Sequence, residues 1–361
     1  MNAALNALKQ PCALIMAGGT GGHIFPGLAV AKDLQAKGWR VYWLGAPASM
    51  EQRLVPSHGI PMELVAFSGV RGKGLKTLAY APFKLLKAVW QAKRIVQRVK
   101  PNVVIGLGGF ITVPGALAAK WCGVPVLLHE QNAIAGMANR YLSHIAKRVF
   151  TAFPNVLTRG EWVGNPMRAE FMLQLPPEQR FANRSGALKV LVLGGSLGAQ
   201  ALNETVPAAL ALLPEHARAQ VVHQSGAKHI DALRDAYYNT GVAADLRPFI
   251  DDVATAMADA DVVICRAGAS TVSELSAVGV PALLVPFPFA VDDHQTANAE
   301  FLTASSAAWL VQQRDLSPQW LAEWLAGLTR EQLLACAIKA SALAQTNAAH
   351  VMVQAAQEEC V

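Results

Sequence analysis

The chain has 361 residues, of which 53% are hydrophobic, so it is long enough for two domains with separate cores. Its five cysteines are scattered without a Cys-x-x-Cys pair, which argues against a disulfide framework and against a zinc site. Residues 1–165 hold 19 Lys and Arg against 5 Asp and Glu, whereas the rest of the chain is acidic, so we expect the first half to face an anionic partner.

Short apolar runs alternate with helical patterns along the first half. We predict strands at residues 12–17, 39–45, 61–67, 101–107, 124–129 and 147–153. Helices are predicted at residues 23–37, 76–99, 111–122 and 135–146. This alternation is typical of right-handed βαβ units in a parallel sheet. The uncharged stretch between Lys100 and Lys120 is interrupted by glycines and prolines, so we predict strand, loop and helix there rather than a membrane span.

A glycine-rich segment, Gly18-Gly19-Thr20-Gly21-Gly22-His23, follows the first strand and opens a helix. Backbone N–H groups at such a helix start favour phosphate. The segment lacks the Gly-Lys-Ser/Thr of a Walker loop and the spacing of a dinucleotide fingerprint. His23 is interpreted either as a general base, because imidazole takes a proton near neutral pH, or as a structural capping residue.

Two further polar or glycine-rich segments follow strands of the first half. Gly106-Leu107-Gly108-Gly109-Phe110 is either a second loop that approaches a ligand closely or a packing turn. His129-Glu130-Gln131-Asn132 stands where the strands of open α/β sheets present ligand-binding groups. One His and one Glu do not make a metal site, so we expect these side chains to form hydrogen bonds.

Residues 71–100 contain nine Lys and Arg and no acidic residue, with apolar residues between them. Phe83, Leu86 and Trp90 share one helical face. Part of this pattern is explained by a helix that covers a sheet, but packing does not require a basic run without acids. We therefore expect peripheral, salt-sensitive binding to an anionic membrane surface. The expected membrane patch consists of Arg71, Lys73, Lys76, Phe83, Lys84, Leu86, Lys87 and Trp90. No nucleic-acid motif occurs, so nucleic acid is not an expected partner.

The rhythm breaks at residues 154–187, which are rich in proline. We place an N-terminal domain at residues 1–162, a linker at 163–187 and a C-terminal domain at 188–340. A final helical segment, 341–361, is expected to pack back on the N-terminal domain. The second half repeats the βα pattern, with strands at 188–194, 219–224, 245–250, 261–266, 281–286 and 307–312. Its predicted helices are 198–213, 227–238, 252–259, 271–278, 294–304 and 317–327.

The second half has its own candidate anion sites. Gly194-Gly195-Ser196 follows a strand, and residues 266–274 join a strand to a helix with several Ser and Thr donors. Glu274 is suited to accept hydrogen bonds from ribose hydroxyls, or it forms a capping box with Thr271. Residues 292–295 suit sugar hydroxyls or cap a helix. The Asp259-Ala260-Asp261 pair precedes its strand, so we expect it at the surface and predict no metal site.

Together these motifs resemble the MurG family of bacterial UDP-N-acetylglucosamine transferases. The resemblance covers essentially the whole chain and implies an α/β protein of the GT-B glycosyltransferase fold. Its two Rossmann-like parallel-sheet domains would face each other across a cleft. The segments that carry the resemblance are Gly18–His23, Ser68–Gly74, Gly108-Gly109, His129–Asn132, Val163–Arg168, Gly194–Ser196, Phe249–Asp252, Arg266–Glu274 and Asp292–Gln295.

The resemblance also implies the reaction. N-acetylglucosamine would pass from UDP-N-acetylglucosamine to undecaprenyl-pyrophosphoryl-N-acetylmuramoyl-pentapeptide (lipid I), with inversion, to give the β-1,4-linked lipid II. The enzyme would work at the cytoplasmic face of the bacterial inner membrane and would need no bound divalent cation or other cofactor. The absence of a recognisable secretory signal agrees with a cytosolic location.

Residue roles carry over by position. His23 would be the catalytic base, and the acceptor side would comprise Gly18, Gly19, Gly108, Gly109, His129 and Glu130. The donor would contact Thr20, Gly21, Gly22, Asn132, Arg168, Ser196, Ile250, Ala269, Ser270, Thr271, Val272, Ser273, Glu274 and Gln295. The chain departs from the family at Phe110, where tyrosine is familiar, so any hydrogen bond from that ring is lost.

Two other functions remain open on the sequence. One is a different GT-B transferase that acts on a lipid acceptor such as diacylglycerol. The other is a two-domain nucleotide-binding module without catalysis. Measuring UDP release with and without lipid acceptor separates them. No oligomeric state follows from the sequence.

Overall fold

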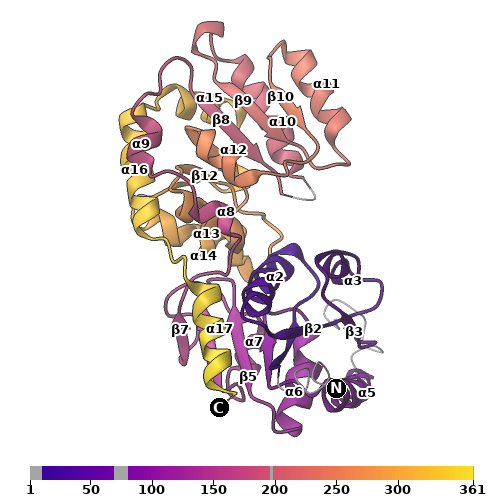
Figure 1. Ribbon diagram of the computed structural model, residues 1–361. Helices are drawn as coiled ribbons and strands as arrows, with labels where there is room; N and C mark the ends of the chain where they lie inside the picture. Colours follow the sequence, from indigo (N-terminus) through magenta and orange to yellow (C-terminus); the bar gives the residue numbers. More distant parts are fainter. Residues whose placement is uncertain (1–9, 69–79, 196–197, 361) are drawn as a thin grey trace. The chain divides into compact units, whose positions relative to one another are not determined.

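The computed structural model describes residues 10–68, 80–195 and 198–360 (Figure 1). The chain divides into two compact units, one formed by Met1–Arg168 with Thr346–Val361 and the other by Ala169–Gln345. The expected linker at 163–187 is therefore split, because residues 163–168 belong to the first unit and the remainder belongs to the second.

Within the described residues, the first unit contains a seven-stranded parallel sheet in the order β3-β2-β1-β4-β5-β6-β7. Its strands are β1 (Cys12–Met16), β2 (Arg40–Gly45), β3 (Met62–Leu64), β4 (Val103–Gly106), β5 (Val126–Glu130), β6 (Arg148–Thr151) and β7 (Gly160–Trp162). Its helices are α2 (Gly21–Ala36), α3 (Met50–Leu54), α5 (Ala81–Val99), α6 (Thr112–Trp121), α7 (Met137–Leu142) and α17 (Ala348–Glu358), with the 3-10 turn η1 (Val55–His58).

Both faces of this sheet are buried, because successive side chains of a strand point to opposite faces. In β1, Ala13 and Ile15 join one core cluster, whereas Leu14 and Met16 join the other. The first cluster includes α2 and α17, and the second includes α5 and α6. Continuous apolar strands such as β1 are typical of this arrangement, and they explain why the central strands of the first unit were predictable.

The C-terminal helix α17 completes the core of the first unit. Its buried side chains form a single stripe with helical spacing. They pack in the same cluster as residues of α2, although more than 300 positions separate the two helices in sequence. The stripe consists of Ala348, Met352, Val353, Ala355 and Ala356.

The second unit repeats the topology of the first. Among the residues described, its parallel sheet has six strands in the order β10-β9-β8-β11-β12-β13. The strands are β8 (Lys189–Leu193), β9 (Gln220–Gln224), β10 (Asp245–Arg247), β11 (Val262–Cys265), β12 (Ala282–Leu284) and β13 (Trp309–Leu310). The helices are α8 (Ala169–Met172), α9 (Pro177–Phe181), α10 (Gln200–Ala211), α11 (Ile230–Thr240), α12 (Val253–Asp259), α13 (Ala269–Val278), α14 (His294–Thr303), α15 (Pro318–Ala326) and α16 (Arg330–Ala342). Three short turns are η2 (Glu215–Ala217), η3 (Val291–Asp293) and η4 (Gln313–Asp315).

In each sheet, successive strands are added first on one side of the unit's first strand and then on the other, so the strand order changes direction at one place. That place lies between β1 and β4 in the first unit and between β8 and β11 in the second. Open parallel sheets bind ligands beyond the carboxyl ends of the strands at such a point. The fold thus directs attention to the loops after these four strands.

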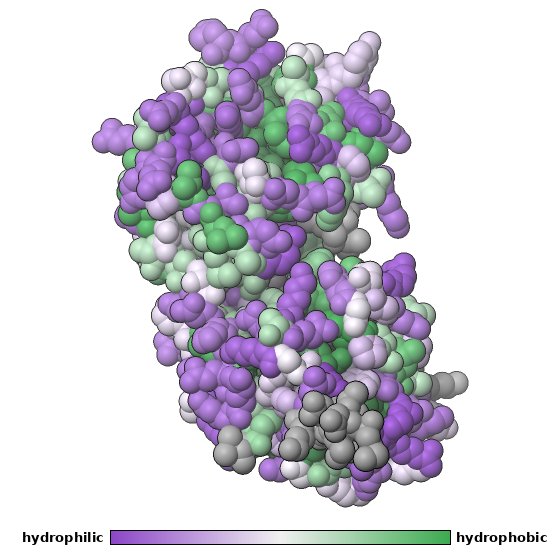
Figure 2. All heavy atoms as spheres, in the orientation of Figure 1, coloured by the Kyte–Doolittle hydropathy of each residue, from purple (hydrophilic) through white to green (hydrophobic). Residues whose placement is uncertain are grey.

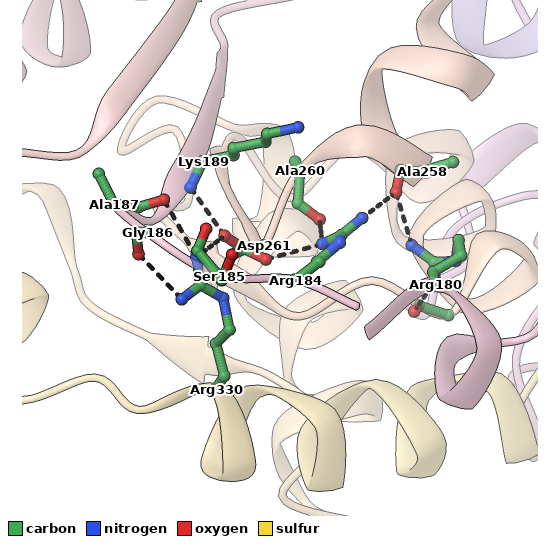
Figure 3. A network of polar contacts seen from close by, with 11 residues as sticks. Arg180, Arg184, Ser185, Gly186, Ala187, Lys189, Ala258, Ala260, Asp261 and Arg330 are labelled. Carbon is green, nitrogen blue, oxygen red and sulfur yellow. Dashed lines mark hydrogen bonds and ion pairs between the residues drawn. The ribbon is translucent and has the colours of Figure 1, made fainter. Parts of the chain in front are cut away.

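Three arginines hold the segment around α9 against the rest of the second unit (Figure 3). Arg180 donates to the carbonyls of Ala258 (2.9 Å) and Val278 (2.7 Å), in the last turns of α12 and α13. Arg184 and Arg330 both pair with the Asp261 carboxylate, at 2.8 and 3.2 Å. Cations are favourable at helix C-termini because they meet the negative end of the helix dipole.

The expectation that Asp261 lies at the surface is wrong. Its side chain is buried, and a third bond joins it to the backbone N–H of Lys189 at 2.8 Å. A buried carboxylate is stable only when it is paired and hydrogen-bonded, and the two guanidinium groups meet that need. Asp261 is thus a structural residue that holds the segment after α9 in place.

Candidate active site

The loop after β1 depends on a buried acid that the sequence analysis missed. Glu51, in α3, has no exposed surface and accepts hydrogen bonds from the N–H groups of Gly19 and Ala46, both at 3.2 Å. A Cβ at Gly18 would lie 2.5 Å from Glu51 Oε1, so only glycine leaves room for this carboxylate. The available sequence signal was the scarcity of acids, because Glu51 is one of five in the basic half.

The loops after β1 and β4 touch through their backbones. Gly109 has a φ of +84°, which side chains disfavour, and a Cβ there would lie 2.4 Å from the carbonyl oxygen of Gly18. Thr112 Oγ1 donates to the Gly108 carbonyl at 2.8 Å and ties the second loop to α6. The Phe110 ring packs near Phe67, with 6.2 Å between ring centroids. Gly109 is therefore needed for packing, whereas the acceptor-side role of Gly108 and Gly109 stays a prediction.

His23 stands in the first turn of α2, beside the second glycine loop. A Cβ at Gly108 would lie 2.9 Å from both Nδ1 and Cε1 of His23, so the glycine makes room for the imidazole. Burial lowers the pKa of His23 to about 4, and the charge of Glu51 opposes this shift. The ring is therefore neutral at pH 7 and has a nitrogen lone pair to offer as a base.

The end of β5 is more deeply buried than expected. His129 and Glu130 are 0% and 2% exposed, and both are engaged within the protein. Glu130 accepts bonds from the backbone N–H groups of Asn132 and Gly136 and from the Asn139 side chain, at 3.0, 3.1 and 2.8 Å. The acceptor-side roles that the sequence suggested for His129 and Glu130 are corrected to supporting roles. Glu130 holds the half-exposed Asn132 at the end of β5.

In the second unit, the loop after β8 and the start of α13 lie beside the reversal of strand order. Gly194 and Gly195 end the described part of this loop, and Ser196 lies outside the described residues. Helix α13 begins at Ala269 with Gly268 as its N-cap, and a glycine offers its first turn no side-chain acceptor. The hydroxyl oxygen of Ser270 is buried and has no hydrogen-bond partner among the described residues. Such an orphaned donor fits a site that an anion fills.

The structure separates the two interpretations of Glu274. A capping box would need Thr271 at the N-cap, but Thr271 lies in the first turn of α13, three positions further on. Glu274 is half-buried on the next turn of the helix. The capping-box alternative is therefore wrong, whereas the ribose interpretation stays a prediction.

Several other residues predicted to bind the sugar donor are buried. The side chain of Val272 has no exposed surface and that of Ile250 is 3% exposed, so neither side chain reaches a ligand. Both backbone N–H groups are also used, by the Gly268 carbonyl and by Gln224 Oε1. Ala269 is nearly buried, and Ser273 Oγ donates to the Ala269 carbonyl at 3.1 Å.

The remaining predicted residues are accessible or lie elsewhere. Gln295 Oε1 accepts from the N–H of Phe287 at 2.9 Å, so this side chain is held at the start of α14. Thr20 and Gly22 are exposed, Gly21 is half-buried, and Arg168 is the last residue of the first unit. Arg71, Lys73 and Lys76 lie outside the described residues, whereas the rest of the expected membrane patch lies on α5.

Comparisons with known proteins agree with this geometry. The model of the glycosyltransferase family 28 N-terminal domain matches residues 13–151, and that of the family 28 C-terminal domain matches residues 189–354. A UDP-N-acetylglucosamine–N-acetylmuramyl-(pentapeptide) pyrophosphoryl-undecaprenol N-acetylglucosamine transferase of Paracidovorax citrulli is 58% identical over 96% of this chain and 98% of its own length. The protein with the same name from Verminephrobacter eiseniae is 59% identical, with the same coverage. The crystal structure of MurG from Acinetobacter baumannii has a TM-score of 0.86 and 41% identity over 96% of this chain and 99% of that chain.

The chain belongs to the MurG family. More distant structures share the fold alone, among them the calicheamicin glycosyltransferase CalG4, at 15% identity and a TM-score of 0.68. The expected GT-B fold with two parallel-sheet domains is thereby confirmed. The residues that the two family models match include both glycine loops of the first unit and the start of α13.

Proposed function

We propose that this protein transfers N-acetylglucosamine from UDP-N-acetylglucosamine to lipid I and so makes lipid II. The observation that carries the proposal is the near full-length relationship to transferases whose names state this reaction, at 58–59% identity. The two anion-friendly helix starts at the strand-order reversals agree with a donor and an acceptor that both contain diphosphate.

The donor diphosphate belongs at the start of α13. The first-turn N–H groups and the partial positive charge of the helix stabilise the UDP that leaves, and Ser270 adds a buried hydroxyl without a partner among the described residues. Glu274, one turn further on, would accept hydrogen bonds from the ribose hydroxyls. This arrangement supplies charge stabilisation through the protein itself, so we propose that no bound divalent cation is required.

His23 is the proposed general base. Its neutral imidazole takes the proton from the attacking acceptor hydroxyl as the oxygen forms a bond to C1 of N-acetylglucosamine. The C1–O bond to UDP breaks, and its electron pair leaves with the diphosphate. Direct displacement of this kind converts the α linkage of the donor into a β linkage in the product.

Helix α5 provides the proposed membrane contact. Phe83, Leu86 and Trp90 are 70%, 66% and 50% exposed, although one helix face already packs in the core through residues such as Val89 and Val96. The adjoining helix α6 adds Trp121, 64% exposed, with the Lys93 ammonium 3.8 Å from its ring centroid. Large exposed apolar side chains among cations suit an anionic lipid interface.

The face of the molecule visible in Figure 2 is mostly hydrophilic, with hydrophobic residues in small groups. Within the described ranges, no helix combines the length and the apolarity that crossing a bilayer requires. We propose that the enzyme works as a peripheral protein at the cytoplasmic face of the inner membrane, with the exposed apolar side chains and the cations of α5 as its contact.

UDP release with lipid I as acceptor tests the proposal. We expect turnover that depends on lipid I, that continues in excess chelator and that does not occur with diacylglycerol. His23→Ala should lower kcat by about 10²–10⁴-fold while donor binding stays nearly unchanged. Release with diacylglycerol alone would favour a different lipid glycosyltransferase, and UDP binding without turnover would favour a nucleotide-binding module.

A further inference from the structure

The hydrogen bonds at the end of β5 determine the tautomer of His129 and the orientation of the Gln131 side-chain amide. His129 Nε2 lies 2.8 Å from the Gly164 carbonyl oxygen, which only accepts, so Nε2 must carry the proton. Burial lowers the pKa of His129 to about 4, so the ring is neutral and its Nδ1 is an acceptor. The Gln131 atom 3.1 Å from Nδ1 is therefore its amide Nε2, the donor.

Because the amide nitrogen of Gln131 faces His129, its oxygen, Oε1, points away from His129. The oxygen is buried and, within the described ranges, lacks a hydrogen-bond donor. His23 Nδ1 is in the same condition. His23 Nδ1 and Gln131 Oε1 both lie close to Gly108. A Cβ built on this glycine would lie 2.9 Å from Nδ1 and 3.2 Å from Oε1. The structure records no hydrogen bond between the two atoms, so the bond proposed below requires a rotation of at least one of the two side chains.

We propose that Gln131 is a positioning residue that accepts a hydrogen bond from Nδ1–H of His23 and so leaves His23 Nε2 as the proton acceptor. This inference rests on the proposed function for the meaning of the proton transfer, but not for the hydrogen bond itself. The opposite tautomer would place two lone pairs face to face in a buried space, which costs free energy. The proposed bond completes a chain of hydrogen bonds, called the relay below, from the Gly164 carbonyl through His129 and Gln131 to His23.

The surroundings of the relay support this role. Gln131 is 2% exposed, and its backbone carbonyl accepts from Asn165 Nδ2 at 3.3 Å, so the residue is fixed at both ends. Two other titratable groups face His23 from the elements around it. Glu51, from α3, favours the imidazolium that forms when the proton is taken, and His129, at the end of β5, disfavours it. Gly108 carries no side chain, which keeps the space between Gln131 and His23 open.

Nitrogen NMR of the full chain with ¹⁵N-labelled histidine tests the hydrogen bond without any need for turnover. The His23 signals are identified by their loss in His23→Ala. We expect the Nδ1–H tautomer in the unsubstituted protein near pH 7.5 and a mixture of tautomers in Gln131→Met. An Nε2–H tautomer in the unsubstituted protein, or no change in Gln131→Met, would overturn the proposal.

Kinetics test the role in the reaction. Gln131→Met should lower kcat about tenfold, with the KM for UDP-N-acetylglucosamine nearly unchanged, and the loss should vanish in the His23→Ala background. The matched control, Gln357→Met, changes an exposed residue of α17 and should leave kcat and tautomer as they are. An equal loss in both backgrounds would overturn positioning through His23. Full turnover in His23→Ala would instead refute the base assignment of the proposed function, and the tautomer measurement would still decide the hydrogen bond.

Discussion

Replacing Glu51 tests how the glycine loop after β1 is held. Glu51→Ala removes the acceptor of two backbone N–H groups, those of Gly19 and Ala46. A hydrogen bond to a charged group contributes about 1.5–3 kcal/mol. The Ala46 bond is buried and counts fully, whereas Gly19 is exposed and its N–H can turn to water. The expected loss in the free energy of unfolding is therefore roughly 2–4 kcal/mol.

Such a loss leaves the first unit folded, because domains have about 5–15 kcal/mol of stability. The loop, however, would no longer be fixed beside His23. We expect the thermal transition of the first unit to fall by roughly 5–15 °C in calorimetry. We also expect kcat for UDP release to fall.

The matched control is Glu161→Ala, which breaks an exposed ion pair with Arg148 in the same unit. Exposed pairs contribute about 1 kcal/mol or less, so the transition should barely move. If Glu51→Ala melts at the same temperature as Glu161→Ala and keeps full kcat, the carboxylate does not hold the loop and the reasoning fails.

Three further predictions concern Glu274, the lysines of α5 and the buried histidines. Glu274→Ala should raise the KM for UDP-N-acetylglucosamine, through loss of bonds that contribute about 1.5–3 kcal/mol, without lowering Tm; a lower Tm at constant KM would contradict the ribose role. Lys84→Glu with Lys87→Glu should weaken salt-sensitive sedimentation with phosphatidylglycerol vesicles, and equal binding to neutral vesicles would rule out electrostatic anchoring. Burial lowers the pKa of His129 to about 4 and of His223 to about 3, so the unfolded chain binds more protons below pH 6.5. The free energy of unfolding in urea should therefore be highest above pH 6.5 and fall as the pH approaches 4; a rise over that range would contradict it.

Strands and long helices were predictable where burial on both sheet faces makes an apolar run continuous, as in β1 and β8. The misses are short. β7 has three residues, Gly-Glu-Trp, and α3 has five, so neither shows a period that a sequence window detects. The strand β7 forms because it pairs with β6 at the edge of the sheet, which is a tertiary contact.

The candidate site was predictable as a set of loops but not as a set of roles. Polar residues at the ends of parallel strands mark a site, and the sequence contains that signal at His23 and Glu274. It does not say which polar groups satisfy one another. Glu130 accepts hydrogen bonds from neighbouring N–H groups, and Asp261 pairs with two arginines, because a buried charge is stable only when it is paired within the fold.

The position of α17 has a consequence for synthesis on the ribosome. The core around α2 contains side chains as late as Ala356, five residues before the end of the chain. Translation delivers the continuous second unit in full before it delivers these residues. The first unit therefore completes its core after the second unit has been synthesised. Until α17 is synthesised, the apolar face of α2 that packs against it stays exposed. A chain truncated after residue 345 would leave that face permanently open, even though every loop of the site would be present.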